Sequence, residues 1–114
     1  RVYAAWDPVP SLDQVLEGSP PANSGAVQSV ESPGQFLFSG GGTTIVQKLI
    51  EDLTGGSFSK VMEAELLEPL KMTNSSFEQP LPASKAIRAA AGHRMTGETI
   101  DGFWHTYNIK AASP

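Results

Sequence analysis

A serine followed by three glycines, at residues 39–42, opens the most strongly patterned segment of the chain. Beyond the glycines, apolar residues recur at the spacing of one helix face, at Ile45, Val46, Leu49, Ile50 and Leu53. Thr44 and Gln47 have the spacing of a capping box, and Gly55 supplies a left-handed stop. The pattern predicts one long helix that buries its apolar face in a core.

A second helix is expected directly after that stop. Ser57 can cap it, and Pro69 ends it. Its apolar side chains are Phe58, Val61, Met62 and Leu66. Because so few residues join the two helices, they must pack against one another as a helical hairpin or corner.

The rest of the chain carries weaker patterns. Ser11 and Gly18 bracket a helix of about two turns, and residues 36–38 have the character of a short buried strand. Alanines favour a third helix over residues 83–91, and the segments around residues 96–98 suit a small β-hairpin. We expect a mainly α (α+β) single domain of about three to four helices, irregular over 1–41, with a helical core over 42–91 and a hairpin and tail over 92–114.

Composition narrows the functional classes. A length of 114 residues suits one domain, and the absence of cysteine removes disulfide frameworks and thiolate zinc sites. No apolar run reaches the ~20 residues that span a bilayer, and a net charge of −4 argues against a nucleic-acid partner. No cofactor is indicated, and localisation stays open between periplasm, cell exterior and cytoplasm.

Two serine-containing patterns have both a chemical and a structural interpretation. The amides of Gly40, Gly41 and Gly42 at a helix start favour an anion or a developing oxyanion, whereas the alternative is a tight turn at a close backbone approach. Ser57 and Lys60 fit the pattern SxxK, in which a lysine removes a proton from a serine one helical turn away. Helix capping already explains Ser57, which is the simpler interpretation.

Other polar and aromatic residues are weaker candidates. His93, Asp101 and His105 could supply three metal ligands, but they lack the spacing of known zinc motifs, and surface histidines are the alternative. Trp104 and Tyr107 form either a ligand-facing aromatic wall or part of the core. The sequence Asn-Ser-Ser at 74–76 fits a glycosylation sequon, which is a frequent pattern.

The order of segments from residue 36 to residue 77 is more specific than any single motif. It reads FLFSGGG at 36–42, TIVQKLIEDLTG at 44–55 and PLKMTNSSF at 69–77. This order resembles the serine β-lactamase and penicillin-binding-protein superfamily, especially its class C-like β-lactamase and esterase branch. The family has a Tyr-Ser/Ala-Asn loop, a long helix ending in Thr/Ser-Gly, a second helix and a Pro-Leu-Gly-Met turn. A further likeness covers residues 11–21 and 91–112.

The resemblance implies that these residues are an internal piece, most of the helical subdomain, of a larger bacterial serine hydrolase. In that parent, a serine outside this segment would be acylated by a β-lactam, ester or peptide, and the acyl-enzyme then hydrolysed. The family's SxxK motif lies upstream of the tyrosine loop, so Ser57 and Lys60 are in the wrong place. Phe38, Ser39 and Gly40 align with the tyrosine loop, and residues 39–42 would line the substrate cleft.

Three positions depart from the family pattern. Phe38 replaces the tyrosine whose phenol would act as a base or proton shuttle, and Gly40 replaces an asparagine. Lys71 stands where glycine would ease the helix exit, at a cost of about 1 kcal/mol if that residue is left-handed. The parent is therefore either catalytically impaired or fills the tyrosine role with another residue.

The resemblance also predicts the behaviour of the chain by itself. Excision would expose the face that packs on the rest of the hydrolase, so we expect an inactive, marginally stable and self-associating chain. One alternative is a stand-alone, non-catalytic module that holds a ligand or peptide on the same helical scaffold. Another is a miniature hydrolase that uses Ser57 and Lys60.

Overall fold

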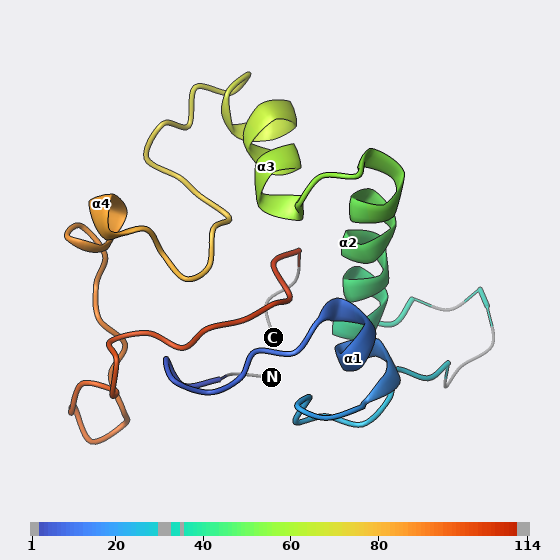
Figure 1. The fold of residues 1–114 in the computed structure, drawn as a ribbon, viewed down its shortest axis with the longest axis horizontal. Helices are drawn as coiled ribbons and strands as arrows, with labels where there is room; N and C mark the ends of the chain where they lie inside the picture. The colour runs from blue at the N-terminus through green and yellow to red at the C-terminus, as the bar shows by residue number, and fades with distance from the viewer. Residues whose placement is uncertain (1–2, 30–32, 35, 112–114) are drawn as a thin grey trace.

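The computed structural model describes residues 3–29, 33–34 and 36–111. Its helical elements are α1 (Leu12–Glu17), α2 (Gly40–Thr54), α3 (Phe58–Met62), the π-helical turn η1 (Glu63–Leu67) and α4 (Ala83–Ala86). Figure 1 shows α1 beside the start of α2 and α3 near its end, while long irregular segments make the other half. Regular structure in these ranges is therefore mainly helical.

Helix α1 forms where the sequence predicts it. The Oγ of Ser11 accepts a hydrogen bond from the Gln14 amide at 3.1 Å, and Gln14 Oε1 accepts one from the Ser11 amide at 2.8 Å. Gly18 ends the helix with a φ of 68°, and a Cβ on it would lie 2.3 Å from the amide nitrogen of Ala26. Leu12 is buried. The caps and the buried side of this helix agree with the prediction.

Helix α2 begins earlier than predicted. Ser39 is its N-cap, with Oγ accepting a hydrogen bond from the Gly42 amide at 2.9 Å, so the three glycines form the first turn. The predicted cap by Thr44 and Gln47 is wrong, because both residues lie inside the helix and are buried. The predicted stop is confirmed, since Gly55 has a φ of 67° and closes the helix.

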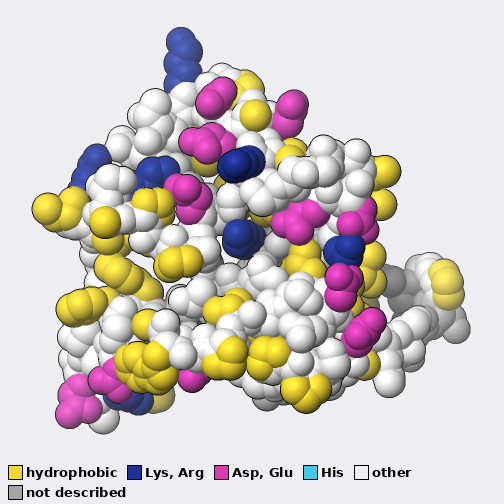
Figure 2. Space-filling model, viewed as in Figure 1, with side chains coloured by type: hydrophobic (Ala, Val, Ile, Leu, Met, Phe, Trp, Pro, Cys, Tyr) yellow, Lys and Arg dark blue, Asp and Glu magenta, His cyan; other side chains and the backbone are white. Residues whose placement is uncertain are grey.

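The two faces of α2 are reversed relative to the prediction. Thr44 and Gln47 are 1% and 0% exposed. Of the five side chains expected in the core, Ile50 is half-buried, and the other four are 51%, 50%, 54% and 77% exposed at Ile45, Val46, Leu49 and Leu53. We call these four residues the α2 apolar face. The prediction that this face packs inside the chain is wrong, because the chain covers the Gln47 side instead. Figure 2 shows further apolar side chains scattered over the visible surface.

The second predicted helix is present and ends in a wider turn. Phe58 is buried, and its amide donates to Glu51 Oε1 at 2.9 Å, which ties α3 to α2 as the short linker predicts. In η1 the Glu68 amide donates to the Glu63 carbonyl at 2.9 Å, a hydrogen bond to the fifth residue before it. This shifts the helix register by one residue, so Leu67 is buried at 7% exposure.

The expected Leu66 is instead 36% exposed. The helix ends at Leu67, with Glu68 as its C-cap directly before Pro69, as expected of a proline that terminates a helix. Lys71 then leaves the turn with a φ of 57°, the left-handed conformation anticipated there.

Three weaker predictions fare less well. Residues 36–38 form no strand, and Phe36 and Phe38 are 97% and 77% exposed. Helix α4 ends at Ala86 instead of residue 91, and none of its side chains is buried to hold a longer helix in place. The segments expected to form a hairpin meet at one antiparallel bridge, between His93 and Thr99, closed by a hydrogen bond from the Arg94 amide to the Glu98 carbonyl at 2.7 Å.

The described chain is open for its length. Its radius of gyration is 15.7 Å, whereas a compact domain of this length has one of about 13 Å. Its accessible surface is 8082 Å², against roughly 6,000 Å² for a folded monomer of this mass. Among the described residues, the buried apolar side chains are Tyr3, Pro10, Leu12, Val15, Phe58 and Leu67. Roughly 2,000 Å² of additional surface is therefore exposed, more than the roughly 800 Å² that one partner buries in a standard protein interface.

Candidate functional site

The first turn of α2 is the site that the sequence singles out. Ser39 has extended backbone, and its carbonyl accepts hydrogen bonds from the Thr43 amide at 3.1 Å and the Thr43 hydroxyl at 3.0 Å. A Cβ on Gly41 would lie 2.7 Å from Val27 Cγ1, so close packing explains that glycine. A Cβ on Gly40 would meet nothing within 4 Å. The turn is therefore accessible to a ligand on the Gly40 side.

The residue before this turn supplies no acid–base group. Phe38 is exposed and carries no titratable atom, and it follows the exposed side chains of Phe36 and Leu37. Residues 36–38 lead directly into α2 (Figure 1), whose apolar face is also exposed. The candidate site thus stands where an apolar segment enters an uncovered helix. Its chemistry is limited to backbone amides and the Ser39 hydroxyl.

Gln47 fixes the opposite side of α2. Its Nε2 donates to the Asn108 carbonyl at 3.0 Å, while its Oε1 accepts from the Lys110 amide at 2.6 Å and the Ala111 amide at 3.1 Å. One fully buried side chain therefore holds residues 108–111 against the helix. The helical period places Gln47 opposite the predicted apolar face, so its burial was not expected from the sequence.

The charged side of α2 is held by surface ion pairs. Lys48 donates a hydrogen bond to the Asp52 carboxylate and lies 3.6 Å from the Asp13 carboxylate on α1. The hydrogen bond to Asp52, with the charge of Asp13 adding to it, raises the pKa of Lys48 above its ordinary value of 10.5. This exposed cluster joins α1 to α2 and carries a structural rather than a chemical role.

The other serine motif shows no catalytic geometry. Ser57 is the exposed N-cap of α3, and its side chain makes no capping hydrogen bond. Lys60 is exposed, and no hydrogen bond joins it to the Ser57 hydroxyl in the described residues. The helix places these residues one turn apart, as SxxK requires. Both side chains are exposed, so nothing there shields them from water.

The residues considered as metal ligands or as an aromatic wall make structural contacts instead. His93 Nδ1 is 3.0 Å from the Ala91 carbonyl, and Asp101 pairs with Arg94 at 3.7 Å. Across residues 3–29, 33–34 and 36–111, no three histidine, aspartate or glutamate side chains gather in a metal-binding arrangement. Trp104 Nε1 donates to the Ala90 carbonyl at 2.7 Å, which anchors the indole at the surface.

Two neighbouring hollows share Ser76, Leu81 and Ala89 in their linings. One, of about 550 Å³, has Trp104 and His105 in its lining. The other, of about 490 Å³, has Lys85 and Arg88 in its lining, together with Asn74 of the sequon. Neither hollow could be predicted from the sequence, because each is formed by residues that are distant in the chain and share no motif.

Comparison with known proteins finds no family model, no curated protein and no solved structure that matches the chain. Among the helices described here, none is long and apolar enough to cross a membrane.

Proposed function

We propose that this chain is an internal segment of a β-lactamase-like serine hydrolase. It would form part of the wall of the substrate cleft, while the nucleophilic serine lies outside residues 1–114. Support comes from the order of sequence segments between residues 36 and 77 and from the exposure of the α2 apolar face. The α2 apolar face is the observation that carries the proposal, because a helix of this length rarely leaves such a stripe uncovered.

Covering the α2 apolar face would release a large free energy for a small domain. Fully burying one valine, leucine or isoleucine is worth about 1.5–3 kcal/mol. The four side chains of the α2 apolar face are each at least half exposed. Covering the exposed halves would therefore contribute roughly 3–6 kcal/mol, comparable with the whole stability of a small domain. The remainder of the hydrolase domain is the covering surface we propose.

Within the proposed parent, residues 39–42 border the bound acyl substrate. Gly40 leaves room for a substrate to reach the backbone of the turn, and Ser39 offers a hydroxyl whose oxygen already accepts from the Gly42 amide. That hydrogen bond fixes the Ser39 rotamer, so its O–H can donate to a substrate oxygen. Phe38 cannot transfer a proton, so the proton of the attacking serine must pass to a group outside this turn.

Intact-mass analysis with serine-acylating probes tests the proposal. The chain and its Ser57→Ala and Ser39→Ala variants are incubated with a penicillin and with a fluorophosphonate. We expect no adduct on the chain, and one adduct per molecule on the protein expressed from the complete reading frame. Peptide mapping should place that adduct on a serine of an SxxK motif upstream of residue 1. An adduct on Ser57, or a complete reading frame without SxxK upstream, would contradict the proposal.

A stand-alone binding module is the second candidate, and the basic hollow beside α4 favours it. That hollow contains two cationic side chains in a chain whose net charge is −4. The candidates differ in one observable property. A stand-alone module is monomeric and melts cooperatively by itself, whereas an excised segment self-associates through its uncovered face.

A further inference from the structure

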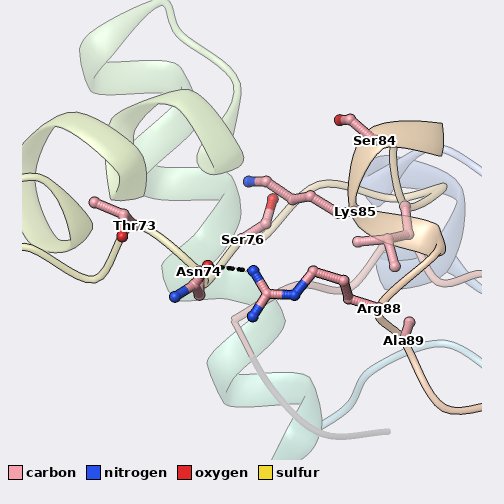
Figure 3. A pocket seen from close by; sticks show the side chains of 8 residues that line it. Thr73, Asn74, Ser76, Ser84, Lys85, Arg88 and Ala89 are labelled. Carbon is pink, nitrogen blue, oxygen red and sulfur yellow. Dashed lines mark hydrogen bonds between the residues drawn. The ribbon is translucent and has the colours of Figure 1, made fainter.

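The hollow beside α4 collects positive charge and hydroxyl groups. It has a volume of about 490 Å³, within the range of small-molecule sites, and Thr73 and Ser84 are in its lining together with Lys85 and Arg88. Figure 3 shows the side chains of Lys85 and Arg88 reaching from the α4 side toward Asn74 and Ser76. No carboxylate is in this lining.

The Arg88 side chain is positioned but not neutralised. Its Nη1 donates to Asn74 Oδ1 at 2.8 Å, so a neutral amide holds the guanidinium in place. Among the described residues, no carboxylate forms an ion pair with Arg88, in contrast to Arg94, which pairs with Asp101. The remaining N–H donors of the planar, fork-shaped guanidinium of Arg88 are therefore available to a ligand.

The Lys85 ammonium lies beside this fork and is only weakly paired. Its Nζ donates to the Ser75 carbonyl at 3.3 Å and lies 3.8 Å from Glu78 Oε2. The same Glu78 oxygen accepts a hydrogen bond from the Ser76 hydroxyl at 3.0 Å. Lys85 and Arg88 are the only charged residues in the lining of this hollow, while three carboxylates, of Glu78, Glu63 and Glu68, surround Lys85 from outside it.

We propose that this basic hollow binds a small carboxylate that carries an apolar group. The two cations of the lining attract a monoanion, whereas the surrounding carboxylates of Glu78, Glu63 and Glu68 would repel a dianion more strongly. The planar fork of Arg88 matches the two oxygens of a carboxylate. The neighbouring hollow with Trp104 in its lining shares Leu81 and Ala89 with this one and offers space for an apolar body. This inference does not depend on the proposed relationship to serine hydrolases.

Titration with benzoate, followed by ¹H–¹⁵N NMR of the chain at constant ionic strength, tests the assignment. We expect saturable shifts at the Arg88 Nε–H group and at the amides of residues 74–76. Benzamide, which has the same ring without the charge, should cause none, and inorganic phosphate should bind more weakly than benzoate. Arg88→Gln should weaken benzoate binding roughly tenfold.

Arg94→Gln is the matched control, because it removes an equal charge from a part of the surface outside the hollow, and it should leave benzoate binding unchanged. Lys85→Gln is also expected to weaken benzoate binding. It replaces Arg88→Gln as the test if that variant loses spectral dispersion. Absence of saturable shifts would overturn the proposal. So would an equal response to benzamide, tighter binding of phosphate, or the same loss of affinity in Arg94→Gln.

Discussion

Replacing Gln47 by alanine should destabilise the chain more than any substitution on the α2 apolar face. The Gln47 side chain is fully buried and makes three hydrogen bonds to the backbone of residues 108–111. An intramolecular hydrogen bond contributes a net of about 1 kcal/mol, so losing three costs about 3 kcal/mol. The partners in the C-terminal segment would also be left without their bonds. This is a large share of the 5–15 kcal/mol that typically stabilises a domain.

Urea denaturation followed by circular dichroism at 222 nm measures this loss, and hydrogen exchange locates it. The Lys110 and Ala111 amides donate to Gln47, so they should lose protection in Gln47→Ala while the amides of α1 keep theirs. Leu53→Ala is the matched control on the same helix, measured at a concentration at which the chain is monomeric. Leu53 is 77% exposed in the single chain, so this change should alter stability by less than about 0.5 kcal/mol. A Gln47→Ala effect below about 1 kcal/mol, with unchanged exchange at both amides, would refute the reasoning.

Three further predictions concern smaller changes in stability. Gly41→Ala should lower the free energy of unfolding by about 1–2 kcal/mol in urea denaturation, because the new Cβ would lie 2.7 Å from Val27 Cγ1. Gly40→Ala is the control with open space around it, and it should stabilise the helix by about 0.5–1 kcal/mol. Lys71→Gly should raise the free energy of unfolding by about 0.5–1 kcal/mol, because Lys71 has a φ of 57°. An unchanged or lower urea midpoint would contradict the strain assigned to Lys71. The hydrogen bond to Asp52 raises the pKa of Lys48, so the pair stabilises the folded state fully below pH 10.5. Its contribution to the free energy of unfolding should be lost as pH rises further, and Lys48→Met should remove this pH dependence.

Local patterns predicted the helix ends well. The stop at Gly55 and the caps at Ser11 and Gly18 each depend on the chemistry of a few neighbouring residues. Such features persist whatever the helix packs against. They could therefore be read from the sequence without knowledge of the fold.

Packing partners were not predictable in the same way. The apolar spacing in α2 identified a face that favours burial, but the chain covers Gln47 on the other side of the helix. The hydrogen bonds that bury Gln47 reach residues more than 60 positions away. The register shift in η1, which buries Leu67 instead of Leu66, also has no counterpart in a regular helical period.

The candidate site shows the same division. The sequence predicted that the turn at residues 39–42 opens a helix, and Ser39 caps α2 there. The basic hollow was not anticipated, because Asn74 and Arg88 come together only through the path of the chain between η1 and α4. A role for the turn in substrate binding remains a proposal based on family resemblance and accessibility.

The central claim is that the α2 apolar face exists to be covered by another surface. Sedimentation equilibrium of the chain over a range of concentrations tests this most directly, with a Leu49→Glu, Leu53→Glu double variant beside it. We predict concentration-dependent self-association of the wild-type chain and a monomer for the double variant, because both leucines are exposed on that face. A wild-type chain that stays monomeric at every concentration and melts cooperatively would contradict the claim.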